Sequence, residues 1–214
     1  MNRDALVHDR ESRWPAVVAV LAIGGVYLAL PESLVIGPRW LHPAMLIVML
    51  TLTIVTHFHG NARWNQVFGH ILAGGITFFM VGSLILLVRA VPTSKEAGLA
   101  MFRSAAALWI TNVLVFAYWY WRLDGGGPHA RLALGDRAPR AFLFPQMTLH
   151  DEPAAANWSP QFIDYLFVGF NTSTAFSPTD AAVLSRWAKI LNMLQAIVSL
   201  TIIAVLAARA INIV

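Results

Sequence analysis

The sequence contains no cysteine and few charged residues. Without cysteine the chain forms no disulfide, holds no metal through thiolates and uses no cysteine nucleophile. Asp, Glu, Lys and Arg make up 12% of the 214 residues, whereas an ordinary globular domain has about 25%. The polar surface that a soluble domain needs is therefore lacking, and the 57% of apolar residues indicate a membrane protein.

Catalytic and nucleotide-binding motifs are also absent. The run Gly125–Gly127 follows no strand and precedes no Gly-Lys-Ser/Thr, so it is not a phosphate-binding loop. Neither a His-Glu-x-x-His motif nor a nucleophile elbow occurs. The net charge of +4 is spread over the loops without a basic run. We expect no enzyme, no cofactor and no nucleic-acid partner.

Long apolar blocks are the main feature of the sequence. Crossing a bilayer takes about 20 mostly apolar residues. Five blocks reach about this length: Trp14–Leu30, Trp40–Phe58, Phe68–Val88, Phe102–Trp121 and Leu184–Ile213. A sixth block, Phe162–Phe176, is shorter and more polar. None shows the alternation of β-barrel strands, so the sequence predicts an all-α, polytopic transmembrane helical bundle with five full spans and a short sixth segment.

This pattern divides the chain into three regions. Residues 1–122 form a four-helix transmembrane region, residues 123–160 an extramembrane loop, and residues 161–214 a short helix, a break and the last span. The glycines of Asp124-Gly-Gly-Gly-Pro128 supply positive φ angles that end a helix.

The third region carries two helix-start signals. Ser159-Pro160 and Ser177-Pro-Thr-Asp180 both place a capping serine before proline at the first helical position. Two alternatives follow for the residues between them: one short spanning helix, or a re-entrant element. In the second, Gln161–Asn171 is helical and Thr172–Phe176 returns as extended chain. Both alternatives predict a break between helices at Phe176–Asp180.

The order of these elements resembles the pore domain of two-helix potassium-type channels. An apolar helix and a long loop precede a short helix, Asn171-Thr-Ser-Thr-Ala-Phe176, then Asp180 and a last helix. The resemblance implies an ion path lined by this threonine-rich segment and built from several copies of the chain. Potassium filters contain glycines that turn carbonyls onto the ion, and the segment from Ala175 to Ser177 has none. We therefore expect weak ion selectivity.

Most of the chain also resembles a family of small bacterial polytopic membrane proteins that brings no settled activity. The residues that carry this resemblance are Trp119-Tyr-Trp121, Asp124-Gly-Gly-Gly-Pro128, Phe142-Leu-Phe-Pro-Gln146 and Thr174-Ala-Phe-Ser-Pro-Thr-Asp180. This resemblance implies a multi-pass protein of the bacterial inner membrane.

Polar residues inside the last two segments are the candidate pore or binding residues: Asn171, Thr172, Ser173, Thr174, Phe176, Asp180, Asn192, Gln195 and Ser199. The last three lie on one face of a helix, where they either line a pore or cavity or form hydrogen bonds between helices. If the sixth segment is re-entrant, Asp164 is expected to form an ion pair with Arg186 or Lys189.

Three histidines near the ends of the second and third blocks, His57, His59 and His70, are the only metal-site candidates. However, His57 and His59 lie on different sides of a helix and no carboxylate is near them in sequence. We therefore interpret the three histidines as residues of the membrane surface and predict no metal site.

Three functional hypotheses remain. The first is a pore-loop cation channel-like protein, a homo-oligomer in the lipid bilayer that passes monovalent cations. The others are a small transporter or permease subunit, and a structural or regulatory membrane protein. The distribution of Lys and Arg predicts that Arg122–Pro160 is cytoplasmic. With six crossings, the same rule places both termini inside.

Overall fold

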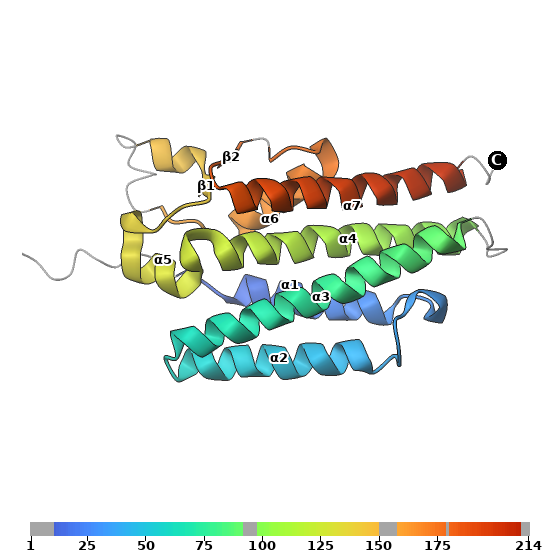
Figure 1. Cartoon of the computed structure of the whole chain (residues 1–214), viewed down its shortest axis with the longest axis horizontal. Helices are drawn as coiled ribbons and strands as arrows, with labels where there is room; N and C mark the ends of the chain where they lie inside the picture. Colours follow the sequence, from blue (N-terminus) through green and yellow to red (C-terminus); the bar gives the residue numbers. More distant parts are fainter. Residues whose placement is uncertain (1–10, 92–97, 150–157, 179, 211–214) are drawn as a thin grey trace, which may run out of the picture.

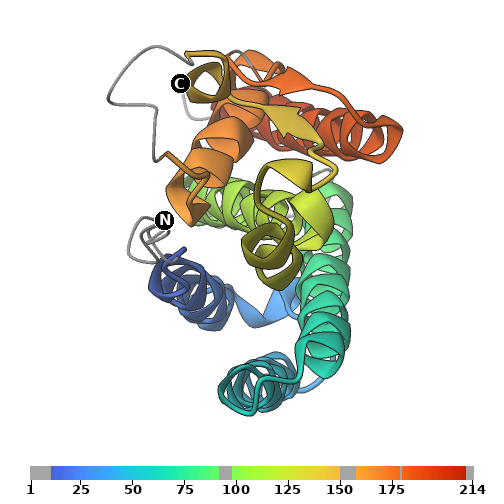
Figure 2. The same ribbon diagram turned by 90° about the vertical axis from the view of Figure 1, so that its left-hand side faces the viewer.

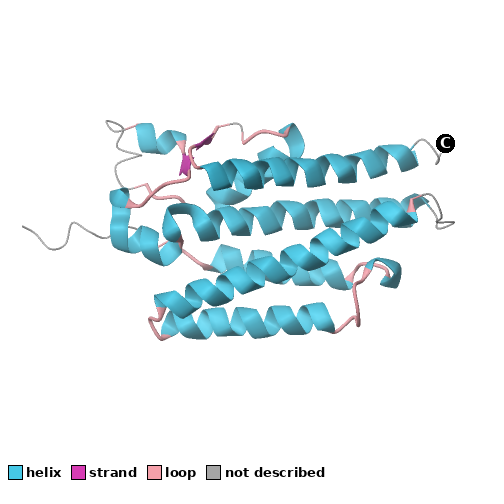
Figure 3. Ribbon diagram, in the orientation of Figure 1, coloured by secondary structure: helices cyan, strands magenta, loops and turns pink. Residues whose placement is uncertain are grey.

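Seven α-helices dominate the computed structural model, which describes residues 11–91, 98–149, 158–178 and 180–210. They are α1 (Trp14–Leu28), α2 (Leu41–Phe58), α3 (Ala62–Ala90), α4 (Gly98–Leu123), α5 (Pro128–Leu134), α6 (Phe162–Ala175) and α7 (Arg186–Ala210). The long helices lie along one axis, and α5 lies across one end (Figure 1). Figure 3 shows how little strand accompanies them, so the predicted all-α class is confirmed.

The remaining regular structure is short. Strand β1 (Phe142–Leu143) pairs antiparallel with β2 (Ala182–Val183), with Phe142 opposite Val183. The described residues include four 3₁₀ turns, at Glu32–Leu34, Asp124–Gly126, Gly135–Arg137 and Pro145–Thr148. Because β1 lies in the link after α4 and β2 lies just before α7, the pair fixes the start of α7 at the end of the bundle that carries α5.

Four helices are long and apolar enough to cross a membrane: α2, α3, α7, and α4 with its continuation to Leu134. They correspond to four of the five predicted spans, although the last residues of the fifth block lie outside the described chain. The first predicted span forms α1, whose 15 residues rise about 22 Å. It begins at Trp14 as predicted and ends two residues early, at Leu28.

The helix α4 is the centre of the bundle. Seen from the end that carries α5, α6 and α7 lie on one side of α4, and α1 and α3 lie on the other (Figure 2). The helix α2 packs on α3 at the periphery. Large apolar side chains such as Ile47, Phe78 and Ile197 are exposed on the outer faces, as expected for helices that contact lipid.

The glycine run after α4 has the predicted conformation. Gly125, Gly126 and Gly127 have φ angles of +60°, +79° and +92°. A Cβ at Gly127 would lie 2.9 Å from the carbonyl oxygen of Arg122. The glycines therefore end α4 and turn the chain sharply, so that Pro128 opens α5 across the end of the bundle.

Candidate functional site

The helix α6 starts at the end of the bundle that carries α5 (Figure 1). Its capping residue is Gln161, which forms a capping box with Asp164. The Gln161 backbone N–H donates to the Asp164 carboxylate at 2.7 Å. The two hydrogen bonds of the capping box satisfy backbone N–H groups that otherwise have no partner at the start of a helix. The prediction that Ser159 caps this helix is therefore wrong by two residues.

The helix ends with an unusual residue. Phe176 has a φ angle of +55° and is the one non-glycine residue of the described chain with a positive φ. The chain then turns back and runs through β2 to the start of α7, where Ser185 Oγ accepts the Ala188 N–H at 3.3 Å. The predicted break at Phe176–Asp180 is confirmed. The predicted start of the last helix at Ser177 is wrong, because α7 begins at Arg186, after the residues that pair with β1.

Two pairs of contacts show that α6 and α7 run in the same direction. Near their starts, Tyr165 and Trp187 both pack on Phe142, with ring centroids 6.2 and 6.3 Å away. Further along, Ser173 and Ser199 both accept hydrogen bonds from one residue, Asn112. Ser199 lies about 20 Å from the start of α7. The chain therefore enters as α6, stops beside the middle of α7 and returns to the end it came from, as in the re-entrant alternative.

The expected extended segment, Thr172–Phe176, is not extended. Thr172, Ser173 and Thr174 belong to the last turn of α6, and only the residues after Phe176 form the return. Hydroxyl groups explain why helix is possible here. Thr172 Oγ1 donates to the Val168 carbonyl at 2.8 Å, and Thr174 Oγ1 donates to the Phe170 carbonyl at 3.0 Å. Such bonds satisfy threonine side chains within a helix.

A buried polar network joins α4, α6 and α7 near the depth at which α6 ends. Gln195 Nε2 donates to the Gly169 carbonyl at 2.6 Å and to Ser173 Oγ at 2.8 Å. Gln195 Oε1 accepts the Tyr120 hydroxyl at 2.6 Å. Asn112 Nδ2 donates to Ser199 Oγ at 2.7 Å and to Ser173 Oγ at 3.3 Å. The predicted polar face of the last helix thus points into the chain, where it bonds to the two neighbouring helices.

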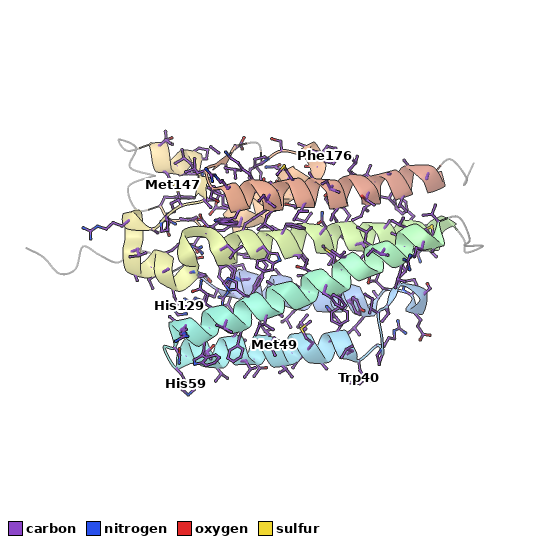
Figure 4. The ribbon with its side chains drawn as sticks, viewed as in Figure 1. Trp40, Met49, His59, His129, Met147 and Phe176 are labelled. Carbon is purple, nitrogen blue, oxygen red and sulfur yellow. The ribbon has the colours of Figure 1, made fainter. Side chains whose placement is uncertain are left out.

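The predicted site residues divide into a buried and an exposed group. Six are buried or half-buried: Asn171, Thr172, Ser173, Asn192, Gln195 and Ser199. Of these, Thr172 and Asn192 contact each other through a long hydrogen bond of 3.4 Å. The exposed group is Thr174, Phe176 and Asp180, from the end of α6 and the return. Figure 4 shows Phe176 on the outside of the bundle.

Asp164 does not meet the basic residues at the start of α7. The ion pairs within the described chain are Arg39–Glu32 and Arg131–Glu11, and the carboxylate of Asp164 caps its own helix instead. Arg186 and Lys189 are both exposed.

The three histidine candidates contact different partners. His57 accepts a hydrogen bond from Arg13, His59 bonds to the Val55 carbonyl, and the His70 ring stacks on Trp119. Within the described residues, no three metal-ligating side chains come close enough to hold an ion.

A cluster of buried charges at the end that carries α5 was missed in the sequence. Asp124 accepts the Ala141 N–H at 2.5 Å and the Tyr165 hydroxyl at 2.7 Å. Arg131 donates to the carbonyl of Asp124 at 2.6 Å and forms an ion pair with Glu11, also at 2.6 Å. Both Asp124 and Arg131 are almost fully buried. The one sequence feature that could have indicated a buried carboxylate is the position of Asp124 directly before three glycines. A loop in water does not require a charged residue at that position.

Comparisons with known proteins identify no relative. No protein-family model matches the chain, and neither a curated protein nor a solved structure matches it.

Proposed function

We propose that this chain is a subunit of a homo-oligomeric, cation-conducting membrane protein, whose ion path runs past the end of α6. The observation that supports the proposal is an exposed break in helical structure at mid-depth. The residues Thr174, Ala175, Phe176 and Ser177 are all exposed, although α6 ends about 20 Å along the bundle, beside Ser199.

Exposure at this depth is incompatible with lipid. Irregular backbone within the hydrocarbon layer has to be covered by protein or to line a water-filled cavity, because lipid offers no hydrogen-bond partners. A second copy of the chain covers the irregular backbone at the end of α6. Several copies arranged around one axis enclose a water-filled path for ions. One face of α6 suits the contact between copies, since Ile163, Phe167 and Phe170 are exposed on it and Thr174 follows them in register.

The electrostatics of the break favour a cation. The last turn of a helix carries carbonyl groups without helical partners and the negative end of the helix dipole. In α6 this end lies beside the middle of α7, where the surrounding apolar helices screen its charge less than bulk water does. The threonine hydroxyl and these carbonyls replace part of the hydration shell of an ion. Because the segment lacks glycine, its carbonyls do not form a potassium-type filter, and selectivity among monovalent cations is weak.

The absence of cysteine permits a clean test of assembly. Ala175→Cys should form disulfide-linked copies in bacterial inner membranes on mild oxidation, and water-soluble thiol reagents should label it. Phe78→Cys is the matched control, because Phe78 is 64% exposed on α3 at a similar depth and should face lipid. A monomeric protein, or equal labelling at both positions, would refute the proposal.

Flux measurements test conduction. Purified wild-type protein in liposomes should pass Na⁺ and K⁺ with similar rates, and Thr174→Val should change the flux several-fold. Thr201→Val is the control, since Thr201 also donates to the carbonyl four residues earlier, at 2.8 Å, but lies on α7 away from the break. Absent flux in the wild type, or equal effects of both substitutions, would overturn the conducting role.

A further inference from the structure

A second candidate site lies on the other side of α4, between α1 and α2 and under α5. It is a cavity of about 660 Å³. Its wall is apolar over most of its length, with Val17 and Val20 from α1 facing Leu50 and Ile54 from α2. Seven residues separate Arg13 from Val20, so the apolar part extends about 10 Å along the helices. Figure 2 shows α1 and α2 separated at this end of the bundle.

Two arginines line the polar end of the cavity. Arg122 is 2% exposed and Arg13 is half-buried. A buried guanidinium is costly unless an anion compensates its charge. Glu11 lines the same cavity, but both of its carboxylate oxygens bind Arg131, at 2.6 and 3.3 Å. Among the described residues, neither Arg13 nor Arg122 forms an ion pair.

Arg122 retains unused hydrogen-bond donors. Its hydrogen bonds within the described part of the chain come from one nitrogen, Nη2, and go to the backbone and side-chain oxygens of Asn65. Its Nε is buried without an acceptor in the described chain. The fold makes room for this arrangement, since a Cβ at Gly69 would collide with the guanidinium. A planar guanidinium with a donor left over and no ion-pair partner among the described residues suits a carboxylate or a phosphate.

Arg13 is held at the mouth of the cavity by two neutral partners. Its Nη1 lies 2.7 Å from Nδ1 of His57 and 2.9 Å from Nε2 of His129. Figure 4 shows His129 in the region between α5 and α1. Burial first, and then the charge of Arg122, lower the pKa of Arg13, whereas the charge of Glu11 raises it. Both guanidinium groups line the one cavity, so their like charges repel each other. A negative ligand between them removes this repulsion.

We propose that this cavity binds an amphipathic anion, with one carboxylate or phosphate between Arg13 and Arg122 and an apolar chain between α1 and α2. A fatty acid and an anionic phospholipid of the facing leaflet share this chemistry. The apolar wall excludes a small hydrophilic anion as the preferred ligand, because such an ion leaves the wall without contacts. This site is separate from the break at the end of α6, on which the proposed conduction depends.

Binding is measured on the purified full chain in a non-ionic detergent with three probes: radiolabelled palmitate, phosphatidylglycerol and inorganic phosphate. We expect saturable binding of palmitate or phosphatidylglycerol, and whichever binds more tightly identifies the source of the ligand. Phosphatidylcholine, which has no net charge, should compete at least tenfold more weakly than phosphatidylglycerol. Binding of inorganic phosphate alone, or of none of the probes, would overturn the proposal.

Variants test the two ends of the cavity separately. Arg13→Gln should weaken binding about tenfold, because a charged hydrogen bond is lost. Val17→Trp fills the apolar part and should abolish binding of palmitate while the arginines remain. Arg63→Gln is the control, since Arg63 is exposed at the same end of the molecule and does not line the cavity. Thermal melting of each variant verifies its fold. Full affinity in both Arg13→Gln and Val17→Trp would refute the site.

Discussion

Replacing Asp124 should destabilise the protein more than any change at an exposed acid. The carboxylate is fully buried and accepts two hydrogen bonds, from the Ala141 N–H at 2.5 Å and from the Tyr165 hydroxyl at 2.7 Å. In Asp124→Ala both donors lose their acceptor inside the protein. An unsatisfied buried donor costs about 1–3 kcal/mol. We therefore expect the free energy of unfolding to fall by about 3–5 kcal/mol.

Asp124→Asn separates hydrogen bonding from charge. The amide keeps the shape of the side chain, and its oxygen still accepts the Ala141 N–H. Its NH₂ group faces the Tyr165 hydroxyl, which then has to act as acceptor, and the negative charge near Arg131 is lost. We expect a loss of about 1–2 kcal/mol, less than in the alanine variant.

The measurement is reversible unfolding in mixed micelles, followed by tryptophan fluorescence. Asp180→Ala is the control, because Asp180 is exposed on the return after α6 and its loss should change stability by less than about 0.5 kcal/mol. If Asp124→Ala and Asp180→Ala unfold alike, the buried charge cluster does not hold α5 and β1 against the bundle, and the reasoning fails.

Substitutions at Phe176 and at Gln195 test the end of α6 and its support. Phe176→Gly should leave the stability within about 1 kcal/mol of the wild type, since glycine adopts a φ of +55° without strain. Phe176→Val should destabilise the protein by about 1–2 kcal/mol. Thermal melting distinguishes the two variants. Gln195→Leu should cost about 1–2 kcal/mol because the Tyr120 hydroxyl loses its acceptor. A double-mutant cycle with Tyr120→Phe should recover part of that loss, and purely additive effects would contradict the bond.

Hydropathy predicted the long helices because insertion into lipid depends on the length and apolar composition of each segment, which can be read from that segment alone. The C-terminal end of α4 followed equally well from local chemistry, since the three glycines after it favour a turn without reference to the rest of the chain. Its start was predicted at Phe102, four residues after Gly98, where α4 begins in the described chain. The start of α7 could not be predicted from local chemistry. Ser177-Pro178 has the composition of a helix start, but the following residues pair with β1, some 40 residues earlier, and a pairing over that distance leaves no local signal.

The polar residues show the same limit. The spacing of Asn192, Gln195 and Ser199 correctly placed them on one face, but spacing does not say what the face touches. The structure turns it towards Asn112 and Ser173. The buried arginines were beyond the reach of sequence reasoning for a related reason. Arginine at the end of a span is ordinarily a surface residue, whereas the Arg122 guanidinium packs against Asn65 and Gly69 of α3.

Orientation in the membrane follows from the direction of α6 and α7. Because both start at the end that carries α5, the basic residues before and after the return lie on one side. That side holds Arg13, Arg63, Arg122, Arg131, Arg137, Arg140, Arg186 and Lys189, whereas Arg39, Arg89, Arg103 and Arg209 lie at the opposite end. Lys and Arg accumulate on the cytoplasmic side, so the α5 end is predicted to be cytoplasmic.

The last prediction is that the α5 end of the bundle and the C-terminal end of α7 lie on opposite sides of the membrane. The six-crossing alternative places both inside, but α7 runs from the α5 end to the far end (Figure 1). A reporter that is active only in the cytoplasm should therefore work when inserted at Asp136 and fail when fused after Val214. An alkaline phosphatase fusion, active only outside, should give the reverse. Cytoplasmic signals at both positions would mean that α6 crosses the membrane completely, and a phosphatase signal at Asp136 would invert the molecule and contradict the charge rule.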